Sequence, residues 1–141
     1  MPTETLRILV VDDEPDICWA LERILRSAGH LVTVMTRGAE ALAQLAREPY
    51  DLAFIDAKLF DLDGYELATR IMHQSPRTTR ILMSGYFDAE DPGVATALAQ
   101  HLFSAFITKP FVISDIRQIV HHVVRERREE SKGGADPDGG R

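Results

Sequence analysis

The chain has 141 residues, of which 27% are charged and 7% aromatic, as expected for one soluble globular domain. Its formal net charge of −6 argues against a broad basic face for nucleic acid, and its single cysteine, Cys18, excludes an intrachain disulfide. No apolar run approaches the roughly 18 residues that a membrane span needs, and no signal sequence opens the chain. We therefore expect a cytoplasmic protein with no nucleic-acid or membrane partner.

The N-terminal segment predicts a strand followed by a helix. Residues 7–11 are a short apolar run that leads into Asp12 and Asp13, as a buried strand of a parallel sheet would. Apolar residues at helical spacing then predict a helix that ends at Gly29 in a left-handed conformation. The predicted inward face leaves out Cys18. It consists of Ile17, Ala20, Leu21, Ile24, Leu25 and Ala28.

The next segment predicts two further strands with a helix between them. Residues 31–35 are rich in β-branched side chains, and Thr36 is the expected N-cap of the helix that follows. Residues 52–56 are another apolar run, which ends in a single carboxylate, Asp56. Open α/β sheets bind ligands beyond the carboxyl ends of their strands, so we interpret Asp56 as the reactive group. Taken alone, Asp56 would more often be an acidic residue that only caps a strand end.

The second half of the chain continues the alternation, with Asp63 as the expected N-cap of its first helix. The elements expected here are a helix over residues 65–74, a strand over 80–83, a helix over 94–102, a strand over 105–108 and a helix over 114–125. From residue 127 onward the chain has no apolar period and many glycines and charges. We therefore expect one domain over residues 5–126 and a disordered tail over 127–141.

Strands that alternate with helices predict the α/β class with a parallel sheet covered on both faces. The expected architecture is a doubly wound, flavodoxin-like sheet of five strands in the order 2-1-3-4-5. In that order the strand ends at Asp12-Asp13, Asp56, Ser84 and Lys109 meet at one edge. Clustered carboxylates repel one another, and a hard divalent cation such as Mg²⁺ relieves that repulsion. With a lysine and a hydroxyl beside it, such a carboxylate is a competent nucleophile toward a phosphoryl group.

Four segments carry a family resemblance to the receiver domain of two-component response regulators, and the resemblance extends over residues 5–126. They are Ile8-Leu-Val-Val-Asp-Asp-Glu-Pro15, Leu52-Ala-Phe-Ile-Asp56 with Asp61-Leu-Asp-Gly64, Ile81-Leu-Met-Ser-Gly85, and Phe106-Ile-Thr-Lys-Pro-Phe111. Residues 18–25 also resemble receivers of nitrogen-regulation-type activators.

The resemblance implies a role for each matching residue at the acidic edge. Asp56 would be the phospho-acceptor. Asp13 and Asp56 would bind Mg²⁺ through their side chains, Asp12 would support the ion through water, and the backbone carbonyl of Lys58 would complete the protein ligands.

The remaining matches are implied to stabilise and report the phosphoryl group. Ser84 would hydrogen-bond the group and Lys109 would pair with it. Ser84 and Phe106 would form the switch, in which phosphorylation draws the hydroxyl inward and the aromatic ring follows. The change would reshape the face made by the fourth helix, fifth strand and fifth helix, which in this family also supports homodimers.

Three features depart from the family pattern. Phe60 stands where the family usually has proline, and Lys58 places a cation two residues beyond the acceptor. Lys58 and Tyr86 occupy positions that tune phosphoryl lifetime in this family. The segment between Ser84 and Lys109 is about three residues longer than usual, which indicates either a longer loop or a specialised partner face.

We therefore expect a stand-alone response regulator that is no enzyme in the ordinary sense, although it catalyses its own phosphotransfer and dephosphorylation. It would accept phosphate from a histidine kinase or phosphotransfer protein onto Asp56 with Mg²⁺ and signal by binding an unknown downstream protein. Two other functions were weighed. A receiver-like module that is never phosphorylated would lack a carboxylate, the hydroxyl or the lysine, and a haloacid-dehalogenase-type phosphatase would carry a second Asp where Lys58 stands.

Overall fold

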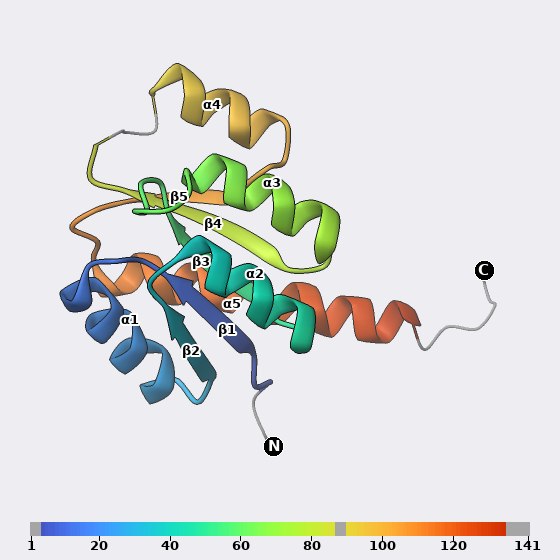
Figure 1. Ribbon diagram of the computed structural model, residues 1–141. Helices are drawn as coiled ribbons and strands as arrows, with labels where there is room; N and C mark the ends of the chain where they lie inside the picture. Colours follow the sequence, from blue (N-terminus) through green and yellow to red (C-terminus); the bar gives the residue numbers. More distant parts are fainter. Residues whose placement is uncertain (1–3, 87–89, 135–141) are drawn as a thin grey trace.

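Five parallel strands form the centre of the molecule, in the order β2-β1-β3-β4-β5 (Figure 1). The structure is a computed structural model and describes residues 4–86 and 90–134. Its elements are β1 (Arg7–Val11), α1 (Pro15–Ser27), β2 (Leu31–Met35), α2 (Gly38–Arg47), β3 (Leu52–Asp56), α3 (Gly64–Gln74), β4 (Thr79–Ser84), α4 (Pro92–Ala99), β5 (Ala105–Thr108) and α5 (Ile113–Gly134). The predicted α/β fold, strand order and flavodoxin-like winding are confirmed.

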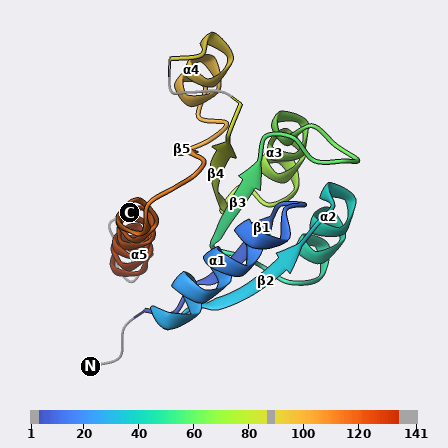
Figure 2. The ribbon, with the colours of Figure 1, turned by 90° about the vertical axis from the view of Figure 1, so that its left-hand side faces the viewer.

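The helices cover both faces of the sheet (Figures 1 and 2). The sheet therefore separates two core clusters, one on each face. In β1, Ile8 and Val10 pack with α1 and α5, while Leu9 and Val11 pack with α2 and α3. A strand buried on both faces needs apolar residues at every position rather than at alternate ones. This is why the continuous apolar runs were correct strand signals. Within the described part of the chain, no helix is both long and apolar enough to cross a membrane.

The inward face of α1 differs from the predicted one at two positions. Cys18 is buried and its thiol donates to the backbone carbonyl of Asp12 at 3.1 Å, whereas Ala28 is exposed. The buried side of α1 is therefore rotated toward Cys18, because the helix begins directly beside the end of β1. Gly29 has a φ of 94° and ends the helix in the left-handed conformation, as predicted.

The cap of α2 comes from a distant loop and not from Thr36, so that prediction was wrong. Arg37 occupies the N-cap position without a side-chain bond. Instead, the Asp61 carboxylate accepts hydrogen bonds from the backbone N–H groups of Gly38 and Ala39, at 2.9 and 3.0 Å. These bonds lower the pKa of Asp61. The loop after β3 is thereby tied to α2.

The helix α3 follows its prediction, whereas α4 is shorter than expected. Asp63 caps α3 by accepting from the N–H groups of Tyr65 and Glu66. The helix predicted to extend to residue 102 ends at Ala99, because His101 has a φ of 62° that no helix residue adopts. The buried guanidinium of Arg80 donates to the backbone carbonyls of His101 and Leu102 and supports that turn.

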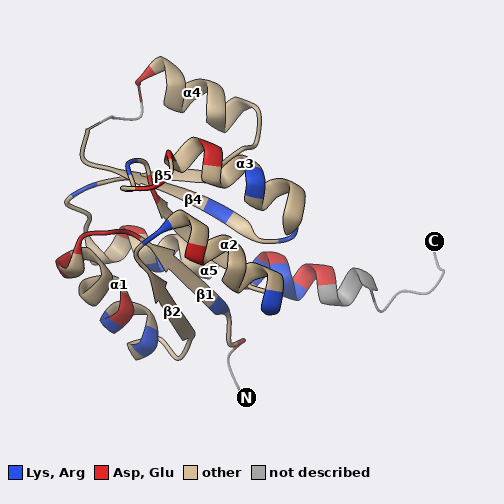
Figure 3. Cartoon of the chain, in the orientation of Figure 1, with Lys and Arg blue, Asp and Glu red and all other residues tan. Residues whose placement is uncertain are grey.

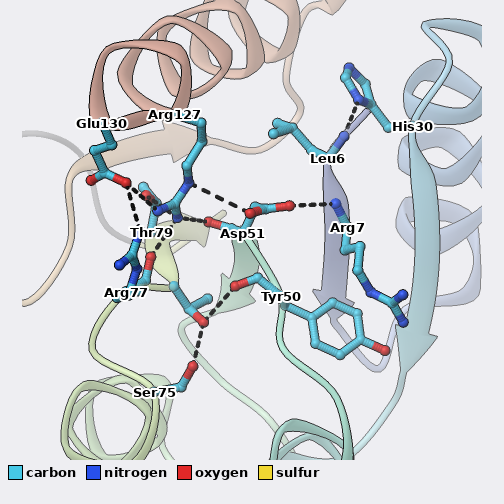
Figure 4. Close-up of polar contacts among 11 residues, drawn as sticks. Leu6, Arg7, His30, Tyr50, Asp51, Ser75, Arg77, Thr79, Arg127 and Glu130 are labelled. Atoms are coloured by element: carbon cyan, nitrogen blue, oxygen red, sulfur yellow. Dashed lines mark hydrogen bonds and ion pairs between the residues drawn. The ribbon is translucent and has the colours of Figure 1, made fainter. Parts of the chain in front are cut away.

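The last helix is longer than predicted. Residues 127–134, assigned to a disordered tail, continue α5, and residues 135–141 of that tail lie outside the described residues. The physical reason is Arg127, whose guanidinium donates to the backbone carbonyls of Asp51, at 2.6 Å, and of Arg77 (Figure 4). Glu130 forms ion pairs with both Arg77 and Arg127. Long-range polar contacts thus hold a segment that has no apolar period.

We expect Arg127→Ala to lower the free energy of unfolding by roughly 1–3 kcal/mol, because two backbone carbonyls at the base of the sheet lose a charged donor. The neighbouring Arg128 is exposed and has no ion pair with a described residue, so Arg128→Ala is the matched control and should change stability by less than about 0.5 kcal/mol. Urea unfolding followed by circular dichroism measures both variants. Equal stabilities would show that the helix end does not depend on Arg127.

Candidate functional site

Three carboxylates meet where β1 and β3 end side by side. Asp56 is the last residue of β3, and Asp12 follows β1 directly, since Val11 and Ile55 are register partners. Asp12 is fully buried, Asp56 is 5% exposed and Asp13 is half-buried. Side-chain oxygens of these three residues lie within 4.8 Å of one another. In Figure 3, the acidic stretch between β1 and α1 is the red segment at this edge of the sheet.

A single ammonium group, from the residue that follows the edge strand β5, lies against the cluster. Lys109 follows β5, and its Nζ lies 2.8 Å from Asp12 Oδ2 and 3.0 Å from Asp56 Oδ1. It also lies 2.7 Å from an oxygen of Glu14. The Lys109 side chain is only 9% exposed, so these contacts are made with little water present. The lysine therefore neutralises part of a charge that burial would otherwise make very costly.

Burial and the contacts between Lys109 and the carboxylates have opposing effects on the pKa values of these groups. Burial raises the pKa of Asp56 to about 6, the neighbouring charge of Asp12 adds to the rise, and Lys109 opposes it. Burial also raises the pKa of Asp12, again against the influence of Lys109. For Lys109, burial would lower the pKa, but its bonds to Asp12, Glu14 and Asp56 outweigh burial and raise it. Near neutral pH the lysine stays charged, and Asp56 is mostly ionised.

The cluster opens into a cavity of about 630 Å³. Its lining residues are Asp13, Glu14, Ile17, Asp56, Lys58, Leu59, Phe60, Gly85, Tyr86, Lys109 and Pro110. Across its mouth, the Nζ of Lys58 lies 4.4 Å from the centre of the Tyr86 ring, which is the range of a cation–π contact. Phe60 is 84% exposed. The cavity gives a reactant access to Asp56, which is itself almost buried.

Ser84 and Phe106 are near this edge but do not line the cavity. Ser84 is fully buried, and its hydroxyl oxygen accepts the backbone N–H of Tyr86 at 2.9 Å. Phe106 is half-buried and packs against the core cluster of α2, α3 and α4. Of the residues singled out in the sequence, the structure thus brings Asp12, Asp13, Asp56 and Lys109 together, and it places Lys58 on the same cavity.

Sequence reasoning missed two residues that shape the site. Glu14 had no assigned role, although it is the third acidic residue after β1 and pairs with Lys109. Gly64 was taken only as the end of a loop. A Cβ at that position would lie 2.3 Å from the backbone oxygen of Asp56, so only glycine permits this close approach. The signal for Gly64 was the Asp-Gly pair shortly after an acidic strand end.

The donor set suits a hard divalent cation. Asp12, Asp13 and Asp56 offer only oxygen ligands, and their clustered negative charge exceeds what the single ammonium of Lys109 compensates. Mg²⁺ binds through a few carboxylates and keeps several of its waters, which the adjoining cavity can hold. The described residues of the site therefore fit Mg²⁺.

Comparison with known proteins decides the family. The profile of the response regulator receiver domain matches residues 8–121. The chain belongs to the response regulator receiver domain family. Receiver domains are phosphoryl-accepting signalling domains of two-component systems that interact with histidine kinases or phosphotransfer proteins and bind Mg²⁺ at an acidic pocket.

Curated relatives are full-length regulators of which this receiver domain matches one part. The chain is 30% identical over 125 residues to "DNA-binding transcriptional regulator NtrC" of Escherichia coli and 35% identical over 127 residues to "Response regulator protein PilR" of Pseudomonas aeruginosa. Each alignment covers 89% of this chain but only 26% and 28% of the respective relative.

Solved structures agree with the sequence comparison. A CheY-like receiver domain protein from Methanospirillum hungatei superposes with a TM-score of 0.82 at 28% identity, over 90% of this chain and 99% of that one. NtrX from Brucella abortus superposes with a TM-score of 0.81 at 26% identity, over 93% of this chain and 29% of that one. The receiver fold therefore makes up nearly all of one of these solved chains and less than a third of the other.

Gly64→Ala should lower both stability and the affinity for Mg²⁺, because the added methyl group collides with the backbone of Asp56 and Ala57. We expect a loss of about 2 kcal/mol or more in the free energy of unfolding. The control is Gly85→Ala, where a Cβ would meet nothing closer than 3.7 Å. Thermal unfolding with and without Mg²⁺ measures both effects. If the two variants behave alike, the close approach at Gly64 is unimportant.

The raised pKa of Asp56 predicts a pH-dependent stability in the presence of a chelator. Folding tightens the hold of Asp56 on its proton, from an ordinary pKa of 3.8 to about 6. This contribution is full below pH 3.8 and is lost as the pH rises through about 6. Asp56→Asn should thus be more stable than the native protein by roughly 1–3 kcal/mol at neutral pH, and the difference should vanish near pH 4.

Asp61→Asn is the control of opposite sign for this experiment. The pKa of Asp61 is lowered by its bonds to α2, so its ionised form favours folding and its loss should destabilise the protein at neutral pH. Chemical unfolding at several pH values compares the two variants. A stability gain for Asp56→Asn that is the same at all pH values would contradict the assignment.

Proposed function

We propose that this receiver domain accepts a phosphoryl group onto Asp56 from the phosphohistidine of a histidine kinase or phosphotransfer protein. The observation that carries the proposal is the arrangement of Asp56, almost buried, 3.0 Å from Lys109 and open to a cavity. Asp13 and Asp56 would hold Mg²⁺ with the backbone carbonyl of Lys58, and Asp12 would support the ion through water. The proposed compartment is the cytoplasm.

The proposed step is a direct displacement at phosphorus. A carboxylate oxygen of Asp56 attacks the phosphorus atom, the phosphorus–nitrogen bond of the donor breaks, and its electron pair returns to the imidazole nitrogen, which takes up a proton. The product is an acyl phosphate on Asp56. Mg²⁺, if held by these residues, would neutralise negative charge that develops on the phosphoryl group, and the Lys109 ammonium would pair with a phosphoryl oxygen. Lys109 then gives up part of its contact with Asp56.

The proposed signal begins at Ser84 and Phe106. The Ser84 hydroxyl would hydrogen-bond the phosphoryl group and rotate away from the N–H of Tyr86 that it now accepts. Phe106 is half-buried, and its ring would move inward behind Ser84. The affected surface is the α4–β5–α5 face, which would bind a downstream protein or a second copy of the chain.

The output of the whole protein is a separate part of the proposal. For the chain itself, we propose signalling through protein binding. The NtrC relative is named as a DNA-binding regulator, and this chain matches about a quarter of it. DNA binding is therefore a property of that whole protein.

Incubation with Mg²⁺ and acetyl phosphate, followed by intact-mass measurement, tests the proposal. We expect one added phosphoryl group on the native protein, none without Mg²⁺ and none on Asp56→Asn. Asp61→Asn removes a carboxylate from the same loop, outside the acidic cluster, and should still be labelled. Labelling of Asp56→Asn would disprove the acceptor assignment. A native protein that is never labelled, even by a phosphorylated kinase, would instead favour an unphosphorylated binding module.

A further inference from the structure

A second cavity, of about 240 Å³, lies between α1 and α5 and shares no lining residue with the acidic site. We call it the α1–α5 groove. Its apolar side chains are Ile24, Leu25, Ala28, Ile116, Val120 and Val124. Both helices lie on the same face of the sheet, opposite α2 and α3 (Figure 2). The groove therefore exposes an edge of the core that the described residues leave uncovered.

The charged side chains of the lining are all arginines. Besides its apolar side chains, the groove is lined by Arg117, Arg125, Arg128, His30 and His121, and no acidic residue is among them. The three arginines are exposed and form no ion pair with any described residue. Several other surface arginines are paired, for example Arg26 with Glu22 and Arg70 with Glu66, whereas three unpaired ones gather at this groove. A basic groove in a chain of net charge −6 is a local property of this surface.

The spacing of these residues defines the shape of what would bind. Arg117, His121, Arg125 and Arg128 stand four, four and three positions apart, so they form one stripe along α5. At 1.5 Å per residue the stripe is roughly 16 Å long, which is about three helical turns. Hydrophobic grooves commonly bind the apolar face of an amphipathic helix.

We propose that the α1–α5 groove binds an acidic amphipathic helix of a partner protein. Its apolar face would lie against Ile24, Val120 and Val124, and carboxylates at the spacing of the stripe would pair with Arg117, Arg125 and Arg128. Charge complementarity argues for this occupant over a second copy of the chain. In a symmetric contact through the groove, the arginines of one copy would face those of the other. The inference is independent of phosphorylation at Asp56.

A synthetic peptide tests the proposal by fluorescence anisotropy. It is about 16 residues long, so that as a helix of about 24 Å it spans the stripe and extends beyond both of its ends. It carries leucines at heptad spacing, glutamates along the flanking stripe and a fluorescent label. We expect saturable binding, weakened at least about 5-fold by Arg125→Glu, because a paired cation becomes an anion. Arg37→Glu changes the net charge equally but lies at the start of α2 and outside the groove, so it should alter the affinity less than about 2-fold.

Charge exchange gives a second, independent readout. The triple variant Arg117→Glu, Arg125→Glu, Arg128→Glu should lose the glutamate peptide and bind the same peptide with lysines in place of glutamates. Amide shifts in nuclear magnetic resonance spectra should change over residues 24–30 and 116–128, and circular dichroism should show that each variant is folded.

Four outcomes would overturn the proposal. The first is no saturable binding by the folded native protein, and the second is an equal effect of Arg37→Glu and Arg125→Glu. The third is a set of peptide-induced shifts outside the groove. The fourth is a dimer of the chain, seen in sedimentation, that Arg125→Glu dissociates, because the groove would then belong to a second copy.

Discussion

The contact of the Lys109 ammonium with Asp12, Glu14 and Asp56 is the interaction on which the acidic site depends. Asp12 and Asp56 are almost completely removed from water, and two such carboxylates would not remain ionised together without a nearby cation. Lys109 follows β5 at one edge of the sheet, whereas Asp12 follows β1 on the far side of β3 and β4. Because the strands are parallel, these residues all lie at the same edge of the sheet. The long side chain of Lys109 can therefore reach carboxylates that are distant in the sequence.

Sequence reasoning succeeded where structure depends on a local pattern. In the runs ending at Val11 and Asp56, every position except Arg7 is buried, which fits strands covered on both faces. Asp63 became an N-cap because the acceptor and the donors are two or three residues apart. The acidic site was predictable for the same reason, since each of its residues lies at the end of a strand or within two residues after it, and parallel strands end at one edge.

Two of the failures involve partners that are far apart in the sequence, and a third involves a contact that the helical period does not describe. Asp61 caps α2 from 23 residues away, so a local rule wrongly favoured Thr36. Arg127 finds its acceptors 76 and 50 residues earlier in the chain, and its polar surroundings alone indicated disorder. The thiol of Cys18 faces inward toward a carbonyl at the end of β1, which the apolar period of α1 does not reveal.

The two attachments of α5 have a mechanical consequence. The helix begins shortly after Lys109 at one end of the strands, and Arg127 bonds it to the backbone of Asp51 and Arg77 at the other end. These hydrogen bonds at the C-terminal part of α5 oppose a shift of the helix along its own axis. We therefore expect a displacement at Lys109 to tilt α5 about Arg127, with the largest movement near the acidic edge and the smallest at the base of the sheet.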